Sequence, residues 1–121
     1  MTMDVLINNI SGHGDADKEY VYIDVDNDCD IGHYLIGDTT YTAEGVVSNK
    51  LRHIYWFPDI KVKAGDVVVL RTGKGKTTSE KMGNGHTKHR FYWQLGSAVW
   101  NNDGDAAVLL RAPEWKHRKV K

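Results

Sequence analysis

The 121-residue sequence has one cysteine, two prolines and two phenylalanines, and it has no apolar run long enough to span a membrane. Its single cysteine, Cys29, excludes an internal disulfide, so the chain needs no oxidising compartment to fold. The first residues lack the basic and apolar segments of a signal peptide. We therefore expect an intracellular protein by default.

Positive and negative charges balance, with 16 lysines and arginines against 16 aspartates and glutamates. This balance argues against a surface that binds polyanions everywhere. The charges are nevertheless unevenly distributed, because residues 1–60 carry a net −8 and residues 61–121 a net +8. Either neighbouring strands attract one another, or the second half forms a basic face that meets an acidic partner.

Length and composition favour one globular domain, with 40% hydrophobic and 26% charged residues. Alternating apolar residues predict a strand at 20–25, with Val21, Ile23 and Val25 on one face and the tyrosines on the other. The apolar run 67–70 predicts a strand covered on both sides. The remaining predicted strands are 5–10, 31–36, 41–47, 52–57, 89–93 and 106–110. Many short strands separated by Gly, Asn and Asp turns, without helical periodicity, predict an all-β sandwich.

Segment 72–88 is predicted to be a long loop, because it has almost no apolar residues. Its run Gly-Lys-Gly-Lys-Thr at 73–77 superficially matches a phosphate-binding loop. That motif needs a glycine where Leu70 stands and a helix after the loop, so we reject it. The domain is expected to span 1–112, followed by a basic tail at 113–121.

Catalytic chemistry finds little support in the sequence. Cys29 lies among aspartates, whose negative charges raise the pKa of a thiol, so a structural cysteine is the better interpretation. The six histidines are scattered, and His86 and His89 either share a metal or are solvated loop residues. We predict no catalytic residues, no cofactor and no enzymatic activity.

A calcium site is a weak candidate at Asp24, Asp26 and Asp28. The spacing begins like a calcium loop, but Cys29 stands where the loop needs glycine and Leu35 where it needs a bidentate glutamate. These carboxylates therefore form either a looser calcium site or a solvated turn.

Basic residues of the second half form the candidate binding surface, because functional residues concentrate on loops held by a rigid scaffold. These residues could also neutralise the phosphates of a nucleic acid, without sequence specificity. The candidate residues are Lys74, Lys76, Lys81, Lys88, Arg90, Lys116, Arg118 and Lys119.

Two segments resemble motifs of lamin-tail domains. Segment 57–69, Phe-Pro-Asp-Ile-Lys-Val-Lys-Ala-Gly-Asp-Val-Val-Val, is similar to one motif, and segment 99–109, Val-Trp-Asn-Asn-Asp-Gly-Asp-Ala-Ala-Val-Leu, is similar to a hairpin of that family. Segments 19–23 and 30–38 match two upstream strands, with Tyr34 where the family usually has tryptophan. The resemblance covers residues 3–112.

This resemblance implies an immunoglobulin-like β-sandwich without catalytic residues, used for binding or tethering. We expect no coiled-coil rod before the domain, so the chain resembles the stand-alone members found in prokaryotes rather than a lamin. We expect a non-enzymatic interaction module that binds a protein partner through loops or a sheet edge. The alternative is DNA binding through the basic loop, 73–90, and the tail.

Overall fold

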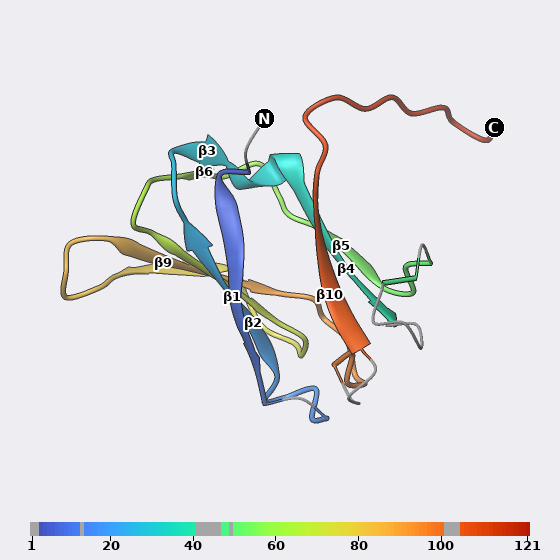
Figure 1. Ribbon diagram of the computed structural model, residues 1–121, viewed down its shortest axis with the longest axis horizontal. Coiled ribbons are helices and arrows are strands. Elements are labelled where there is room, and N and C mark those ends of the chain that lie inside the picture. The colour runs from blue at the N-terminus through green and yellow to red at the C-terminus, as the bar shows by residue number, and fades with distance from the viewer. Residues whose placement is uncertain (1–2, 13, 41–46, 49, 101–104) are drawn as a thin grey trace.

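The computed structural model describes residues 3–12, 14–40, 47–48, 50–100 and 105–121 (Figure 1). Ten strands and one short 3-10 helix make up the regular structure of these residues. They are β1 (Val5–Ser11), β2 (Tyr20–Val25), β3 (Cys29–Asp30), η1 (Ile31–His33), β4 (Tyr34–Thr40), β5 (Ile54–Trp56), β6 (Lys61–Val62), β7 (Val67–Arg71), β8 (Thr78–Lys81), β9 (Thr87–Tyr92) and β10 (Asp105–Arg111).

The strands form two main layers and a short end piece. The larger sheet has the order β1-β2-β7-β9-β8, the smaller sheet has the order β10-β4-β5, and β3 pairs with β6. All pairs are antiparallel except β7 with β9. The prediction of an all-β sandwich of two mostly antiparallel sheets is therefore confirmed.

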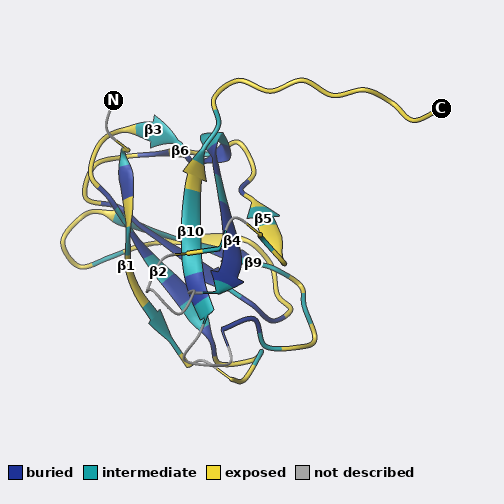
Figure 2. Cartoon of the chain, turned by 45° about the vertical axis from the view of Figure 1, so that its right-hand side comes forward, coloured by how far each residue is buried: buried dark blue, intermediate teal, exposed yellow. Residues whose placement is uncertain are grey.

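The core lies between the two sheets. Val21 and Ile23 of β2, with Leu70 of β7, meet Tyr34 and Ile36 of β4 in one buried cluster. The apolar run at 67–70 is buried on both faces of its strand, as the sequence predicted. In Figure 2, β4 is buried along much of its length, whereas the tail after β10 is exposed.

Two predictions need correction. Segment 72–88 is not one long loop, because β8 and the start of β9 pair as an antiparallel hairpin within it. Because β8 is exposed throughout, this hairpin shows no apolar alternation, and the local sequence does not mark it as a strand. The predicted strand 31–36 begins as η1 before it becomes β4. The predicted strand at 41–47 and the turn at 101–104 lie almost wholly outside the described residues.

Asp66 fixes the start of the parallel pair of β7 and β9. Its carboxylate accepts hydrogen bonds from the backbone N–H groups of Lys63 and Thr87, each at 3.0 Å, and lies 3.0 Å from Nε2 of His89. Burial alone would raise the pKa of Asp66, but the hydrogen bonds from His89, Thr87 and Lys63 outweigh it and lower the pKa below its ordinary value of 3.8.

Stability is expected to fall in acid because of this carboxylate. A folded-state pKa below the unfolded value means that the ionised form stabilises the fold. This contribution is complete above the ordinary aspartate value and disappears as the pH falls through the lowered value. Urea unfolding from about pH 6 to about pH 2 measures it. The difference in stability between wild type and Asp66→Asn should shrink across the acid end, and a difference that stays constant with pH would contradict the assignment.

Candidate functional site

The structure brings four of the eight predicted basic residues to one surface. Lys88 and Arg90 lie on the face of the larger sheet that points away from the core, called here the outer face. Lys74 and Lys76 lie in the exposed connection between β7 and β8. This connection runs along the same face, because a Cβ added to Gly75 would lie 2.5 Å from the Tyr92 ring.

The other four predicted residues lie elsewhere. Lys81 pairs with Thr87, one position beyond the pair of Glu80 with Lys88, so it falls on the opposite face of the hairpin. The tail, with Lys116, Arg118 and Lys119, leaves β10 on the far side of the sandwich from the hairpin (Figure 1). The eight residues therefore do not form one continuous face, and DNA binding through all of them stays an untested prediction.

Sequence reasoning missed three residues of the outer face. Tyr20, Tyr22 and Arg71 lie beside Lys88 and Arg90 around a shallow hollow. Arg71 places its guanidinium carbon 5.3 Å from the centre of the Tyr20 ring. The alternation of β2 had already placed both tyrosines away from the core, but the pairing of β2 with β7 was needed to connect them to the cations.

A second exposed surface lies on the smaller sheet, and the sequence did not predict it. Ile54 and Trp56 of β5 are 50% and 45% exposed, and Leu110 of β10 and Trp115 of the tail are 38% and 58% exposed. The Trp115 ring meets the Trp56 ring edge to face, with centroids 5.0 Å apart. The indole N–H of Trp56 donates to the carbonyl of Gly32 at 2.8 Å, which holds this ring in place. We call these four exposed residues the aromatic patch.

The aspartates of the weak calcium candidate serve separate local contacts. Asp24 accepts a hydrogen bond from the side-chain amide of Asn8 at 2.7 Å, and Asp28 accepts one from the backbone N–H of Ala64 at 2.8 Å. The Asp26 side chain is exposed. Among the residues that the structure describes, no group of three or more His, Cys, Asp or Glu side chains is placed to hold a metal ion.

Cys29 borders a cavity of about 470 Å³ that is lined by both acidic and basic side chains. Burial raises the pKa of its thiol to about 11, with further increases from Asp4, Asp30 and Asp28. The sequence predicted that the pKa of this thiol is raised, and the structure agrees. Burial makes the largest contribution to the increase, ahead of the aspartates. A thiol with this pKa is protonated at neutral pH and is a weak nucleophile.

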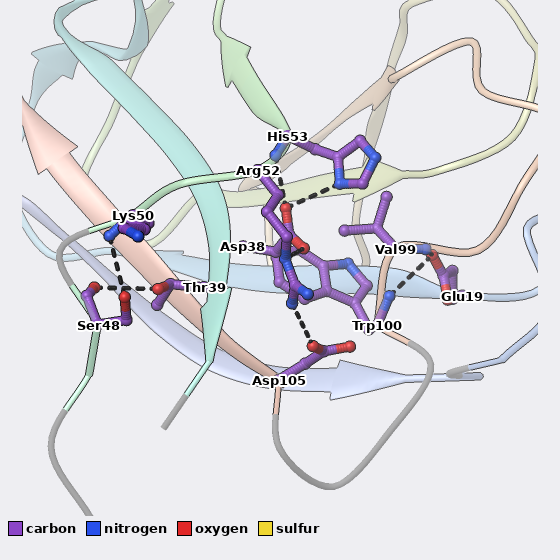
Figure 3. Close-up of polar contacts among 10 residues, drawn as sticks. All are labelled: Glu19, Asp38, Thr39, Ser48, Lys50, Arg52, His53, Val99, Trp100 and Asp105. Atoms are coloured by element: carbon purple, nitrogen blue, oxygen red, sulfur yellow. Dashed lines mark hydrogen bonds and ion pairs between the residues drawn. The ribbon is translucent and has the colours of Figure 1, made fainter. Parts of the chain in front are cut away.

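Glu19 joins three segments at one end of the sandwich, and Figure 3 shows its contacts with Val99 and Trp100. Its fully buried carboxylate accepts hydrogen bonds from Thr72 Oγ1 at 2.7 Å, from the backbone N–H of Val99 at 2.5 Å and from that of Gly14 at 3.2 Å. The backbone N–H of Trp100 adds a longer contact at 3.4 Å. Trp100 is itself buried in the core, but its indole nitrogen finds no partner among the described atoms.

Asp38 is the second buried carboxylate of this region (Figure 3). Its Oδ1 accepts from the backbone N–H of His53 at 2.7 Å and lies 2.9 Å from the ring Nδ1 of the same residue. Arg52 lies 3.4 Å from the other oxygen and 2.7 Å from Asp105 of β10. In the described part of the chain no hydroxyl or thiol hydrogen-bonds His53. The contacts of Asp38 with His53 and of Arg52 with Asp38 and Asp105 fasten the chain entering β5 to β4 and β10.

These surfaces belong to an all-β sandwich whose two outward sheet faces differ in chemistry, one basic and tyrosine-rich and the other apolar. No family model matches the chain, and no curated protein matches its sequence. Nor does any helix of the described residues have the length and apolar character needed to cross a membrane.

Proposed function

We propose that the chain is a non-enzymatic interaction module of lamin-tail type that binds a protein partner on the smaller sheet. The aromatic patch carries this proposal. Soluble domains rarely leave large apolar side chains exposed side by side unless they meet a partner there. Tryptophans held in fixed orientations also lose little entropy on binding, which is why they dominate the energetics of many interfaces.

The occupant we propose is an extended segment of another protein that carries apolar and acidic side chains. The β5 strand ends its sheet, and no described strand pairs with its free edge. A partner strand can add its backbone hydrogen bonds there and place alternate side chains on Ile54 and Trp56. Lys116, Arg118 and Lys119 closely follow Trp115, so acidic residues in the partner would find complementary charge.

The lamin-tail resemblance supports this class of function without identifying the partner. The motif at 57–69 corresponds to β6, a turn and β7, and the segment Val99-Trp100 reaches the core. The segment at 19–23 falls at the start of β2. These positions fit the expected use of the motifs, which is to build a sandwich that presents its edges and connections.

Selection from a random peptide library tests the proposal. The full chain, immobilised, is expected to enrich peptides that combine aromatic or aliphatic residues with aspartate or glutamate. Trp115→Ala should weaken binding of these peptides at least tenfold, because central tryptophans carry a large share of interface energy. The matched control is Leu6→Ala, which removes an equally exposed apolar side chain, 58% exposed, from the larger sheet. Failure to enrich any peptide, or equal effects of the two variants, would refute the aromatic patch as the binding site.

A further inference from the structure

The outer face of the larger sheet has a second set of features that the proposed function does not use. Three strands place Tyr22, Val69 and Arg90 side by side in one cross-strand row. The next row places Tyr20 beside Arg71, and Lys88 flanks the other side. Neighbouring strands lie about 4.8 Å apart, so these side chains share one small area.

These side chains surround a hollow of about 120 Å³. Its wall contains three cations and two phenol groups, and it contains no carboxylate; the lining residues are Tyr20, Tyr22, Val69, Arg71, Lys88 and Arg90. Val69 is only 4% exposed and gives the hollow an apolar floor. Nearby apolar groups lower the local dielectric constant and strengthen the attraction of an anion to the cations.

The cations are only partly neutralised by the protein. Arg90 pairs with Glu80 at 2.6 Å, whereas among the described residues no carboxylate forms an ion pair with Arg71 or Lys88. Asp24 and Glu80 are the acidic residues on the same face, and Asp24 already accepts the amide of Asn8. The hollow therefore has an excess of positive charge and of hydrogen-bond donors, because phenol, guanidinium and ammonium groups all donate.

Size and stacking decide which anion fits. Pockets for whole cofactors or drug-sized ligands hold about 300–1,000 Å³, so this hollow is suited to a single small group. The guanidinium of Arg71 stacks on the Tyr20 ring, and Gly75 packs against the Tyr92 ring. With these two ring faces occupied, a nucleic-acid base would have only the Tyr22 ring of the hollow to stack on.

We propose that this hollow binds a phosphate- or sulfate-type oxyanion, as a free ion or as an ester on another molecule. Arg71 and Lys88 supply the charge, and the hydroxyl groups of Tyr20 and Tyr22 supply further donors. Arg90 joins when the anion competes with Glu80. A tetrahedral oxyanion can accept several charge-assisted hydrogen bonds at once, so the hollow should prefer it to chloride.

Titration of the full chain with inorganic phosphate at low ionic strength, followed by backbone amide shifts, tests the proposal. Low salt is needed because screening weakens exposed charge interactions. The amides of Val69 and Lys88 should shift with saturation, and chloride at the same concentration should not reproduce the shifts. Arg71→Gln should weaken phosphate binding about tenfold, because it removes a charged donor.

Two further variants make the test specific. Lys81→Gln removes the same charge from the opposite face of the hairpin, so its affinity should stay within about twofold of wild type. Glu80→Gln frees Arg90 and should raise the affinity. If Lys81→Gln weakens binding as much as Arg71→Gln, or if no saturable shift occurs, the hollow is not a site and the proposal fails. These results do not bear on the aromatic patch.

A phosphoserine peptide, titrated in parallel, distinguishes the two sources of the oxyanion. Tighter binding of this peptide than of inorganic phosphate, lost in Arg71→Gln, assigns the hollow to an ester on a protein. Equal affinities for the two assign it to the free ion. If the peptide binds more tightly than phosphate and Arg71→Gln does not change its affinity, the peptide contacts another surface. That result would count against the hollow.

Discussion

Replacing Glu19 with alanine is expected to lower the free energy of unfolding by about 3–5 kcal/mol, because several buried donors then lose their acceptor. The hydroxyl of Thr72 and the backbone N–H groups of Val99 and Gly14 all donate to this one carboxylate. Thr72 and Val99 are buried together with Glu19, whereas Gly14 is exposed. Each unsatisfied buried donor costs about 1–3 kcal/mol. Urea unfolding followed by far-ultraviolet circular dichroism measures the loss.

Two companion variants separate hydrogen bonding from charge and volume. Glu19→Gln keeps the size and one acceptor oxygen but puts an amide NH₂ in place of the other oxygen, so a smaller loss of about 1–3 kcal/mol is expected. Glu114→Ala removes an exposed glutamate of the tail and should change stability by no more than about 0.5 kcal/mol. Equal unfolding midpoints for Glu19→Ala and Glu114→Ala would show that the network adds nothing to stability. If Glu19→Ala does not fold, Glu19→Gln still supplies the comparison.

The strands that the sequence predicted well are those that bury apolar side chains. In β2, each second residue must enter the core, so period-two alternation marks both the strand and its outer face. In β7 an unbroken apolar run marks a central strand with both faces covered. The hairpin of β8 and β9 escaped prediction because β8 is exposed throughout and buries no apolar side chain.

The candidate surfaces were harder to predict than the fold, since they depend on register. One position separates Glu80 from Lys81, and this single step decides which of them lies on the same face as Lys88. The aromatic patch likewise depends on Leu110 and Trp56 both pairing with Leu35 across the smaller sheet. Such long-range pairings leave no local signal in a single sequence.

The buried hydrogen-bond acceptors were also hard to predict from the sequence. The sequence marks Glu19 only as part of a motif, because its partner Val99 lies 80 positions away. A glutamate beside a strand normally indicates a solvated position, as glutamate is almost never fully buried without partners. Its N–H donors belong to the backbone, which carries no residue-type signal, so the role of Glu19 emerged only from the folded chain.

Asp38→Ala is expected to destabilise the fold by about 2–4 kcal/mol, through the same kind of loss at the other sheet. The Asp38 side chain is 2% exposed and holds both the backbone N–H and the ring of His53. Removing it also leaves Arg52 with Asp105 as its ion-pair partner among the described residues. The change detaches the chain entering β5, so binding at the aromatic patch should weaken together with stability.

Ranking three variants distinguishes the buried acceptor from the exposed charges around it. Asp38→Asn keeps an oxygen for the N–H of His53 and should cost less than Asp38→Ala. Arg52→Gln should cost about 1 kcal/mol or less, because half of that side chain is exposed and solvent screens its ion pairs. Lys18→Ala, which removes the exposed pair with Asp15 at 4.0 Å, is the control and should be nearly neutral. If Arg52→Gln lowers the free energy of unfolding as much as Asp38→Ala does, the ion pairs hold β5 in place rather than the hydrogen bonds to His53.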